Sequence, residues 1–106
     1  MTEPTTETRT PFVQPICALF AQALGRARIG PSDNFFILGG DSLAVADLAL
    51  LLEDNLNVQV TDLDILEHPT PVALACFILQ NSGQIDDWLA RLPDDEIALL
   101  SESLLG

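Results

Sequence analysis

Ser42 is the residue whose setting most suggests chemistry. It follows Gly39-Gly40-Asp41, where an apolar loop gives way to a helical pattern, so we expect it in the first turn of a helix. A serine there is exposed, and the positive end of the helix dipole favours a phosphate group beside it. The residues alone leave two interpretations open: Ser42 accepts a covalent group, or it only belongs to the helix cap.

A role for Ser42 as a catalytic nucleophile finds little support. A serine hydrolase needs a base, usually His, and a residue that orients the base. The chain has a single His, His68, between Glu67 and Pro69, and we expect it to be a loop residue. The GGDSL context also lacks the G-x-S-x-G elbow of hydrolases. We therefore expect that the chain is not an enzyme and has no catalytic residue.

The cysteines, acidic residues and glycines of the chain do not form the spacing of a catalytic, metal-binding or phosphate-binding site. Cys17 and Cys76 each lie in an apolar helical pattern, which predicts buried thiols in a reducing compartment. No acidic run has EF-hand spacing, and no Cys/His set has zinc spacing, so we expect no metal. The Gly39-Gly40 pair matches neither a P-loop nor a dinucleotide-binding fingerprint.

Charge and composition limit the possible partners. The 106 residues suit one domain, and 48% of them are hydrophobic, which argues against disorder throughout. A net charge of -12 disfavours nucleic acid and anionic membranes and suits partners with basic patches. We see neither a signal peptide nor an apolar run long enough to span a membrane. We therefore expect a cytoplasmic monomer that binds neither nucleic acid nor membrane.

The first element that must position Ser42 is an amphipathic helix. Residues 1–10 are rich in Thr, Glu and Pro, which predicts a disordered tail. Apolar residues then recur at helical spacing from Pro11 or Phe12 to Leu24, and Gly25 suits a C-terminal cap. The residues predicted to face the core from this helix are Val13, Ile16, Leu19, Phe20 and Ala23.

A long loop over residues 25–40 leads from this helix to Ser42. It contains four consecutive apolar residues, Phe35, Phe36, Ile37 and Leu38. They cannot all lie in water, so we expect the loop to pack on the core. A loop of this length is uncommon unless it is functional. We expect that it delivers residues 39–42 to a fixed position.

The second helix should run from about Ser42 to Asn55, with Asp41 as its cap. A rotation of 100° per residue places Val45, Leu48, Leu52 and Leu56 on the core face. The opposite face carries Leu43, Ala46, Asp47, Leu50 and Asp54. Exposed leucines ringed by charge favour a weak contact patch, although chance exposure remains an alternative.

The rest of the chain predicts further helices. Residues 57–60 read as an extended loop, and Thr61 with Asp64 predicts the start of a short helix over 62–67. Thr70-Pro71 starts another helix, which closes at 81–83. Residues 85–92 and 94–104 form two apolar stripes, which either fold back on the bundle or face a partner. The stripes consist of Ile85, Trp88, Leu89 and Leu92, then Ile97, Leu100 and Leu104, after an acidic helix start at Asp94, Asp95 and Glu96.

Residues 33–43 read DNFFILGGDSL, and this run resembles a known signature. It is similar to the D-x-F-F-x-L-G-G-D-S-L motif of peptidyl carrier (thiolation) domains of nonribosomal peptide synthesis, in the phosphopantetheine-binding acyl carrier superfamily. The resemblance continues to residues 65–70, which look like the family's L-F-E-x-P-T segment. It covers residues 16–79.

The resemblance implies both a fold and a cofactor. The fold is all-α: a four-helix carrier bundle over 11–83 with a short third helix, followed by a helical extension or linker over 84–106. By matching position, Ser42 receives 4′-phosphopantetheine from coenzyme A, with Asp41 and Leu43 as its neighbours. The thiol of that arm holds amino acids or peptides as thioesters.

The resemblance also implies partners. A phosphopantetheinyl transferase that uses magnesium adds the arm, and an adenylation enzyme loads it. Condensation, ketosynthase, acyltransferase or tailoring enzymes follow. The predicted partner surface consists of Leu43, Ala46, Asp47, Leu50 and Leu66.

Three departures from the family pattern bear on these expectations. Asp47 and Leu51 occupy positions that often carry basic residues, so the second helix is more acidic than usual. Leu66 replaces a Phe. Residues 85–106 lie beyond the usual domain, and residues 92–96 resemble linker helices found after carriers.

Four functions remain as hypotheses. The first is an aminoacyl or peptidyl carrier of secondary metabolism, either free-standing or excised from a larger synthetase. The second is a discrete acyl carrier that delivers an amino-acid-derived starter unit to a polyketide synthase. An unmodified acidic helical adaptor and a small Ser hydrolase are the others. The sequence names neither the cargo nor the loading enzyme.

Overall fold

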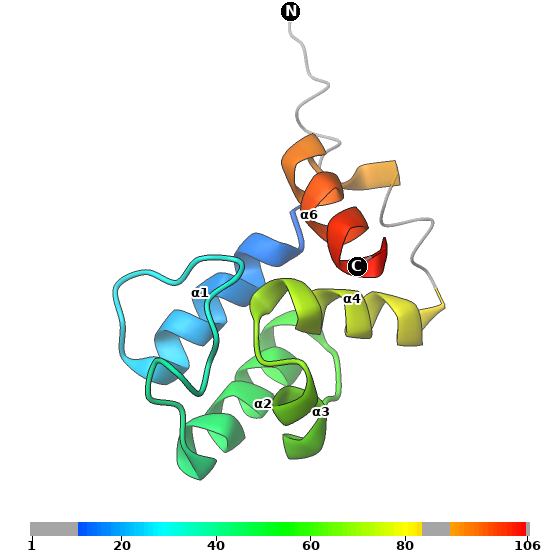
Figure 1. Cartoon of the computed structure of the whole chain (residues 1–106). Coiled ribbons are helices and arrows are strands. Elements are labelled where there is room, and N and C mark those ends of the chain that lie inside the picture. The colour runs from blue at the N-terminus through cyan, green and yellow to red at the C-terminus, as the bar shows by residue number, and fades with distance from the viewer. Residues whose placement is uncertain (1–10, 84–89, 106) are drawn as a thin grey trace, which may run out of the picture.

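The computed structural model describes residues 11–83 and 90–105, and every regular element within those ranges is a helix (Figure 1). The predicted all-α bundle with a short third helix and an extra C-terminal helical segment is confirmed. The predicted tail over 1–10 and the residues Ile85, Trp88 and Leu89 lie outside the described residues. The helices are α1 (Val13–Leu24), α2 (Ser42–Leu56), α3 (Asp62–Glu67), α4 (Pro71–Ser82) and α6 (Asp94–Leu105).

Local signals set most of the helix ends. Gly25 closes α1 in the left-handed conformation, with φ of 67°, which a residue without Cβ adopts at little cost. Thr61 accepts a hydrogen bond from the Asp64 N–H while the Asp64 carboxylate accepts one from the Thr61 N–H, so α3 begins with the predicted capping box. Thr70 caps α4, which begins at Pro71.

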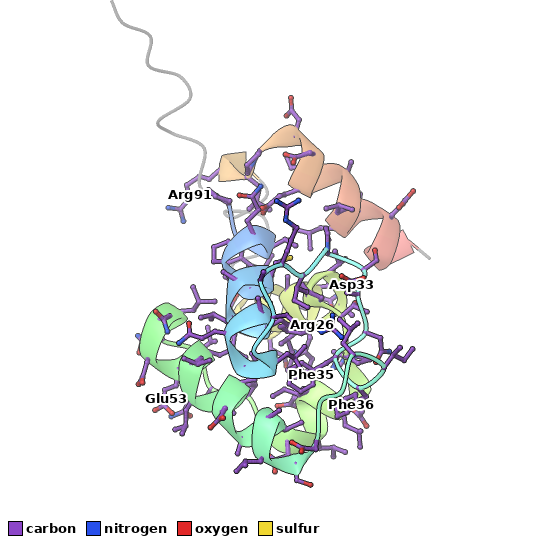
Figure 2. The ribbon with its side chains drawn as sticks, turned by 90° about the vertical axis from the view of Figure 1, so that its left-hand side faces the viewer. Arg26, Asp33, Phe35, Phe36, Glu53 and Arg91 are labelled. Carbon is purple, nitrogen blue, oxygen red and sulfur yellow. The ribbon has the colours of Figure 1, made fainter. Side chains whose placement is uncertain are left out.

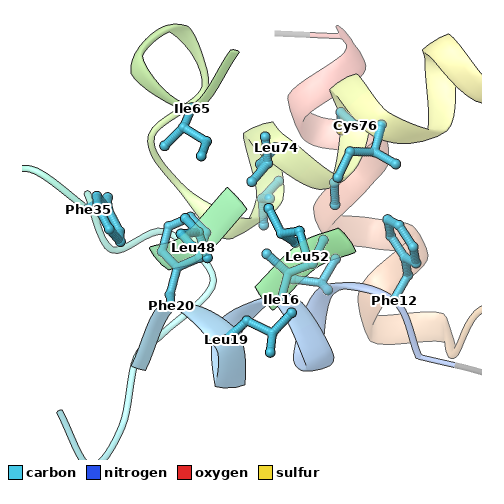
Figure 3. Close-up of a cluster of buried hydrophobic side chains, with 14 of the residues drawn as sticks. Phe12, Ile16, Leu19, Phe20, Phe35, Leu48, Leu52, Ile65, Leu74 and Cys76 are labelled. Carbon is cyan, nitrogen blue, oxygen red and sulfur yellow. The ribbon is translucent and has the colours of Figure 1, made fainter. Parts of the chain in front are cut away.

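The core lies where α1 packs against α2 and α4, with α3 against α2 and α6 against α4 (Figures 1 and 3). Apolar burial supplies most of the favourable free energy of such a bundle. Ala23 and Leu56, predicted to be core, are only half-buried at the ends of their helices, and Ala21 is buried instead. The large side chains with almost no exposure include Ile16, Phe20, Phe35, Leu48, Leu52, Ile65, Leu74, Leu79, Leu92 and Leu100.

The loop between α1 and α2 is held to the bundle by Phe35 (Figure 2). The Phe35 ring is fully buried and meets the Phe20 ring edge-on at 5.2 Å between centroids. Its N–H donates to the Pro69 carbonyl at 2.8 Å, and the Val72 N–H donates to the Pro31 carbonyl at 3.1 Å. These bonds join the loop to the α3–α4 junction, so the prediction that the loop packs on the core is confirmed.

That prediction did not say which of the four apolar side chains would be buried, and Ile37 is 82% exposed. The Asn34 side-chain oxygen accepts hydrogen bonds from the N–H groups of Phe36 and Ile37 and closes a tight turn. Consecutive side chains on a turn point in different directions. Phe35 therefore takes the inward place and Ile37 faces solvent.

The C-terminal helix α6 folds back on the bundle. Its apolar stripe had left two alternatives open, packing on the bundle or facing a partner. Leu92 and Leu100 are fully buried in the same core as α1 and α4. Glu96 was predicted only as an acid of its own helix start, but it is 1% exposed and accepts hydrogen bonds from the backbone of α1. No residue pattern near α1 predicts this contact, because Glu96 and α1 lie at opposite ends of the sequence.

We predict that Phe35→Ala lowers the free energy of unfolding by about 3–5 kcal/mol, because it empties a buried ring site. The matched control is Ile37→Ala, two residues along the same loop, which should change it by less than about 0.5 kcal/mol. Urea unfolding monitored by circular dichroism measures both. Equal losses in the two variants would contradict the anchoring role of Phe35.

Candidate functional site

Ser42 is exposed and is the first residue of α2. Asp41 precedes it in an extended conformation, and its side-chain oxygen accepts a hydrogen bond from the Ala44 N–H at 2.9 Å. The Asp41 carbonyl accepts the first helical bond, from the Val45 N–H. The prediction that Asp41 caps this helix is confirmed. The cap presents the Ser42 hydroxyl at the positive end of a 15-residue helix.

The two glycines before Ser42 meet two different requirements. Gly39 has φ of 108°, a region that residues with a side chain rarely adopt. Gly40 lies against Phe35: a Cβ here would collide with the ring and come within 2.7 Å of the Phe35 carbonyl oxygen. The Gly40 N–H donates to that carbonyl at 2.9 Å. The loop thus closes back on its own anchor immediately before α2 begins, which fixes where Ser42 lies.

A cavity of about 580 Å³ opens beside Ser42, between the start of α2 and α3. Its walls are mainly apolar, and two carboxylates, Asp41 and Asp62, lie among them. Leu63 and Leu66 line it from α3 although both side chains are more than half exposed. Phe36, Gly40, Ser42 and Val45 complete the lining.

The residues that could activate Ser42 lie elsewhere. The His68 Nδ1 lies 2.9 Å from the Asp64 carbonyl, the ring stacks on Phe77 with centroids 4.5 Å apart, and His68 does not line the cavity. Among residues 11–83 and 90–105 no cluster of His, Cys, Asp and Glu suits a metal ion. Of the residue types that serve as the base of a serine nucleophile, the single His of the chain is thus not part of the cavity lining beside Ser42.

Cys17 and Cys76 are not joined in a disulfide within this fold. Cys76 is buried, as predicted, whereas Cys17 is half-buried at the edge of the α1 core stripe. Burial raises the pKa of the Cys17 thiol to about 11, helped by the negative charges of Glu96 and Asp33. Cys17 therefore stays protonated near neutral pH and is a poor nucleophile.

The predicted contact patch is exposed as a whole. Leu43 and Leu50 are 73% and 59% exposed, and Ala46 and Asp47 lie exposed between them on α2. Leu66 adds to it from α3, which packs beside α2. The sequence reasoning missed Leu63, although its i, i+3 spacing to Leu66 places both on one face of α3. It also missed Ile37, on the loop before Ser42.

The fold and the site together define a class: a small helical bundle that presents a serine at a helix N-terminus. Solved structures of this class resemble the chain. BlmI, a type-II acyl carrier protein from Streptomyces verticillus involved in bleomycin biosynthesis, superposes with a TM-score of 0.62 at 24% identity, covering 66% of this chain and 84% of BlmI. A nonribosomal peptidyl carrier protein (PCP) domain gives a TM-score of 0.58 at 28% identity, covering 71% of this chain and 91% of that one.

The chain belongs to the phosphopantetheine attachment site family, whose pattern matches residues 14–78. This family match confirms the predicted family membership and the predicted cofactor, 4′-phosphopantetheine. A dimodular nonribosomal peptide synthase of Bacillus subtilis is 37% identical over 70 residues, which cover 66% of this chain and 3% of that protein. The chain spans 3% or less of the first curated relatives it matches.

None of the helices in the described ranges is long and apolar enough to cross a membrane.

We predict that Asp41→Ala destabilises the protein by about 1 kcal/mol, because the Ala44 N–H loses its side-chain acceptor. Asp41→Asn is the matched control, since it retains an acceptor oxygen and should lose only a few tenths of that energy. Urea unfolding of the three proteins measures the difference. If Asn were as destabilising as Ala, the negative charge rather than the hydrogen bond would be what α2 needs.

Proposed function

We propose that this chain is a peptidyl or aminoacyl carrier of nonribosomal peptide synthesis and that Ser42 carries its 4′-phosphopantetheine arm. The observation that supports Ser42 most is its exposure at the first residue of α2, within the family match. The arm supplies a thiol that holds an acyl group as a thioester. A group so used must reach other enzymes, and an exposed helix start allows that.

The residues around Ser42 suit an acceptor that other proteins act on. The helix N-terminus favours the negative phosphate of the arm, and the cavity beside Ser42 has room for part of a chain of this kind. No His lines the cavity beside the hydroxyl, so we propose that the transferase supplies the base. We therefore propose a carrier that is not itself an enzyme.

The nonribosomal type of carrier is supported by the relatives. Both the Bacillus synthase and the similar PCP domain carry that description, and each is at least 28% identical to this chain. They do not favour the alternative of delivering a starter unit to a polyketide synthase. We propose residues 11–83 as the carrier unit, residues 84–106 as an extension of it, and the cytoplasm as the place where the chain meets coenzyme A.

We propose the contact patch as the surface that partner enzymes recognise. It combines apolar side chains with a strongly acidic surround, which suits brief contacts with basic partners. Enzymes that share one carrier must release it after each step, so small interfaces suit the task. Adenylation and condensation enzymes, and the transferase, are the partners this proposal names.

The attachment site is tested by intact mass after incubation with coenzyme A, magnesium and a broad-range phosphopantetheinyl transferase. We expect one phosphopantetheine adduct on the wild type and on Ser32→Ala, an exposed loop serine that serves as control. Ser42→Ala should gain none, because it lacks the hydroxyl. An unmodified wild type would sink the carrier proposal, and an adduct on Ser42→Ala would sink the site.

The contact patch is tested by the rate at which the cognate adenylation enzyme loads the holo protein. We expect Leu43→Asp and Leu50→Asp to slow loading by about tenfold or more, as loss of an interface anchor costs over about 1 kcal/mol. Gln22→Asp adds the same charge on an exposed position of α1 and should load like the wild type. Unchanged rates for both leucine variants, with the fold intact by circular dichroism, would count against the patch.

A further inference from the structure

Among the residues whose side chains the structure describes, Glu96 is the only charged one that is buried. It joins two distant parts of the chain. One carboxylate oxygen accepts hydrogen bonds from the N–H groups of Phe12 at 2.7 Å and Val13 at 2.8 Å. The other accepts from the Gln14 N–H at 3.1 Å. Three of the amides at the start of α1 thus depend on a residue more than 80 positions away.

The start of α1 has no side-chain cap of its own. Phe12 occupies the N-cap position, and its side chain makes no capping hydrogen bond. The first N–H groups of a helix have no partner within the helix, and burying them unpaired is unfavourable. A carboxylate is the best acceptor for this position, since the positive end of the α1 dipole also favours its charge. Glu96 therefore takes the role that Ser, Thr, Asp or Asn usually plays.

The helix that carries Glu96 also covers part of the core. Leu100 of α6 is buried, and its carbonyl lies 3.7 Å from the Cys76 sulfur on α4. Figure 1 shows α6 at the end of the bundle away from α2 and α3. The middle of the loop lies closer to it, because Ser32 lines one cavity with Leu99 and Glu102 of α6. The polar cap and the apolar contacts act on the same helix, so α6 and the start of α1 should open and close together.

We propose that α6 is an intramolecular strap, held by Glu96, that closes the face formed by α1 and α4. When the strap is docked, Cys76 and the neighbouring core are covered by the chain's own helix rather than by a partner enzyme. Its release would expose this face without disturbing α2, α3 or Ser42. The strap thereby leaves the α2–α3 end as the open face of the carrier.

The test uses Cys76 as a reporter of strap opening. A Cys17→Ser background leaves Cys76 as the single thiol of the chain. Iodoacetamide should alkylate Cys76 about tenfold faster or more in Glu96→Gln, because one strong acceptor of the α1 cap is weakened. The matched control is Asp95→Asn, which removes the same charge from the adjacent exposed position of α6 and should react like the background protein.

Hydrogen exchange on the same proteins decides whether the opening is local. In Glu96→Gln the amides of Val13, Gln14 and α6 should lose protection together, while α2 and α3 retain theirs. The proposal is overturned if Cys76 reacts at an unchanged rate, or if α1 opens while α6 stays protected. If Glu96→Gln loses amide protection everywhere, hydrogen exchange of the wild type in low concentrations of urea is measured instead. The proposal then requires the α6 amides to lose protection at a lower urea concentration than those of α2. Neither readout needs Ser42 to be modified, so the test stands apart from the proposed function.

Discussion

The close packing of Gly40 against the buried Phe35 ring is the constraint on which the position of Ser42 depends. Phe35 is fixed on one side by Phe20 of α1 and on the other by a hydrogen bond to the Pro69 carbonyl. Gly40 then bonds to the Phe35 carbonyl, two residues before Ser42. If Ser42 is the attachment site, as proposed, the transferase has to find its hydroxyl in one fixed place, and this packing supplies that place.

This constraint explains why so acidic a protein contains so apolar a loop. The chain carries 16 acidic residues against 4 basic ones, and their mutual repulsion opposes compaction. Most acidic groups lie exposed on the surface, where solvent screens them. The buried side chains of Phe35 and Ile29, with the backbone bonds at Pro31 and Phe35, hold the connection between α1 and α2, which has no regular structure. The acidic groups can then remain at the surface.

The features that could be predicted from the sequence are those set by neighbours along the chain. The caps at Asp41, Thr61 and Thr70, the glycine end of α1 and the faces of α2 each follow from residues within one or two turns. The exposure of Ile37 could not be predicted, because it depends on which of four similar side chains the core accepts. The cap on α1 was also beyond reach, since Glu96 meets Phe12 only through the tertiary fold.

The two ends of the bundle are thus stabilised by different kinds of interaction. At the α2 end, the Asp41 cap and the turn at Gly40 hold Ser42, together with the contacts that Phe35 makes with Phe20 and Pro69. At the α1 end, a carboxylate from the last helix completes the first one, so this end forms only when nearly the whole chain has folded. Contacts of such long separation add stability late and hold the less local elements most weakly. None of the contacts that place Ser42 involves Glu96, so we expect the proposed attachment site to keep its geometry when the α1 end opens.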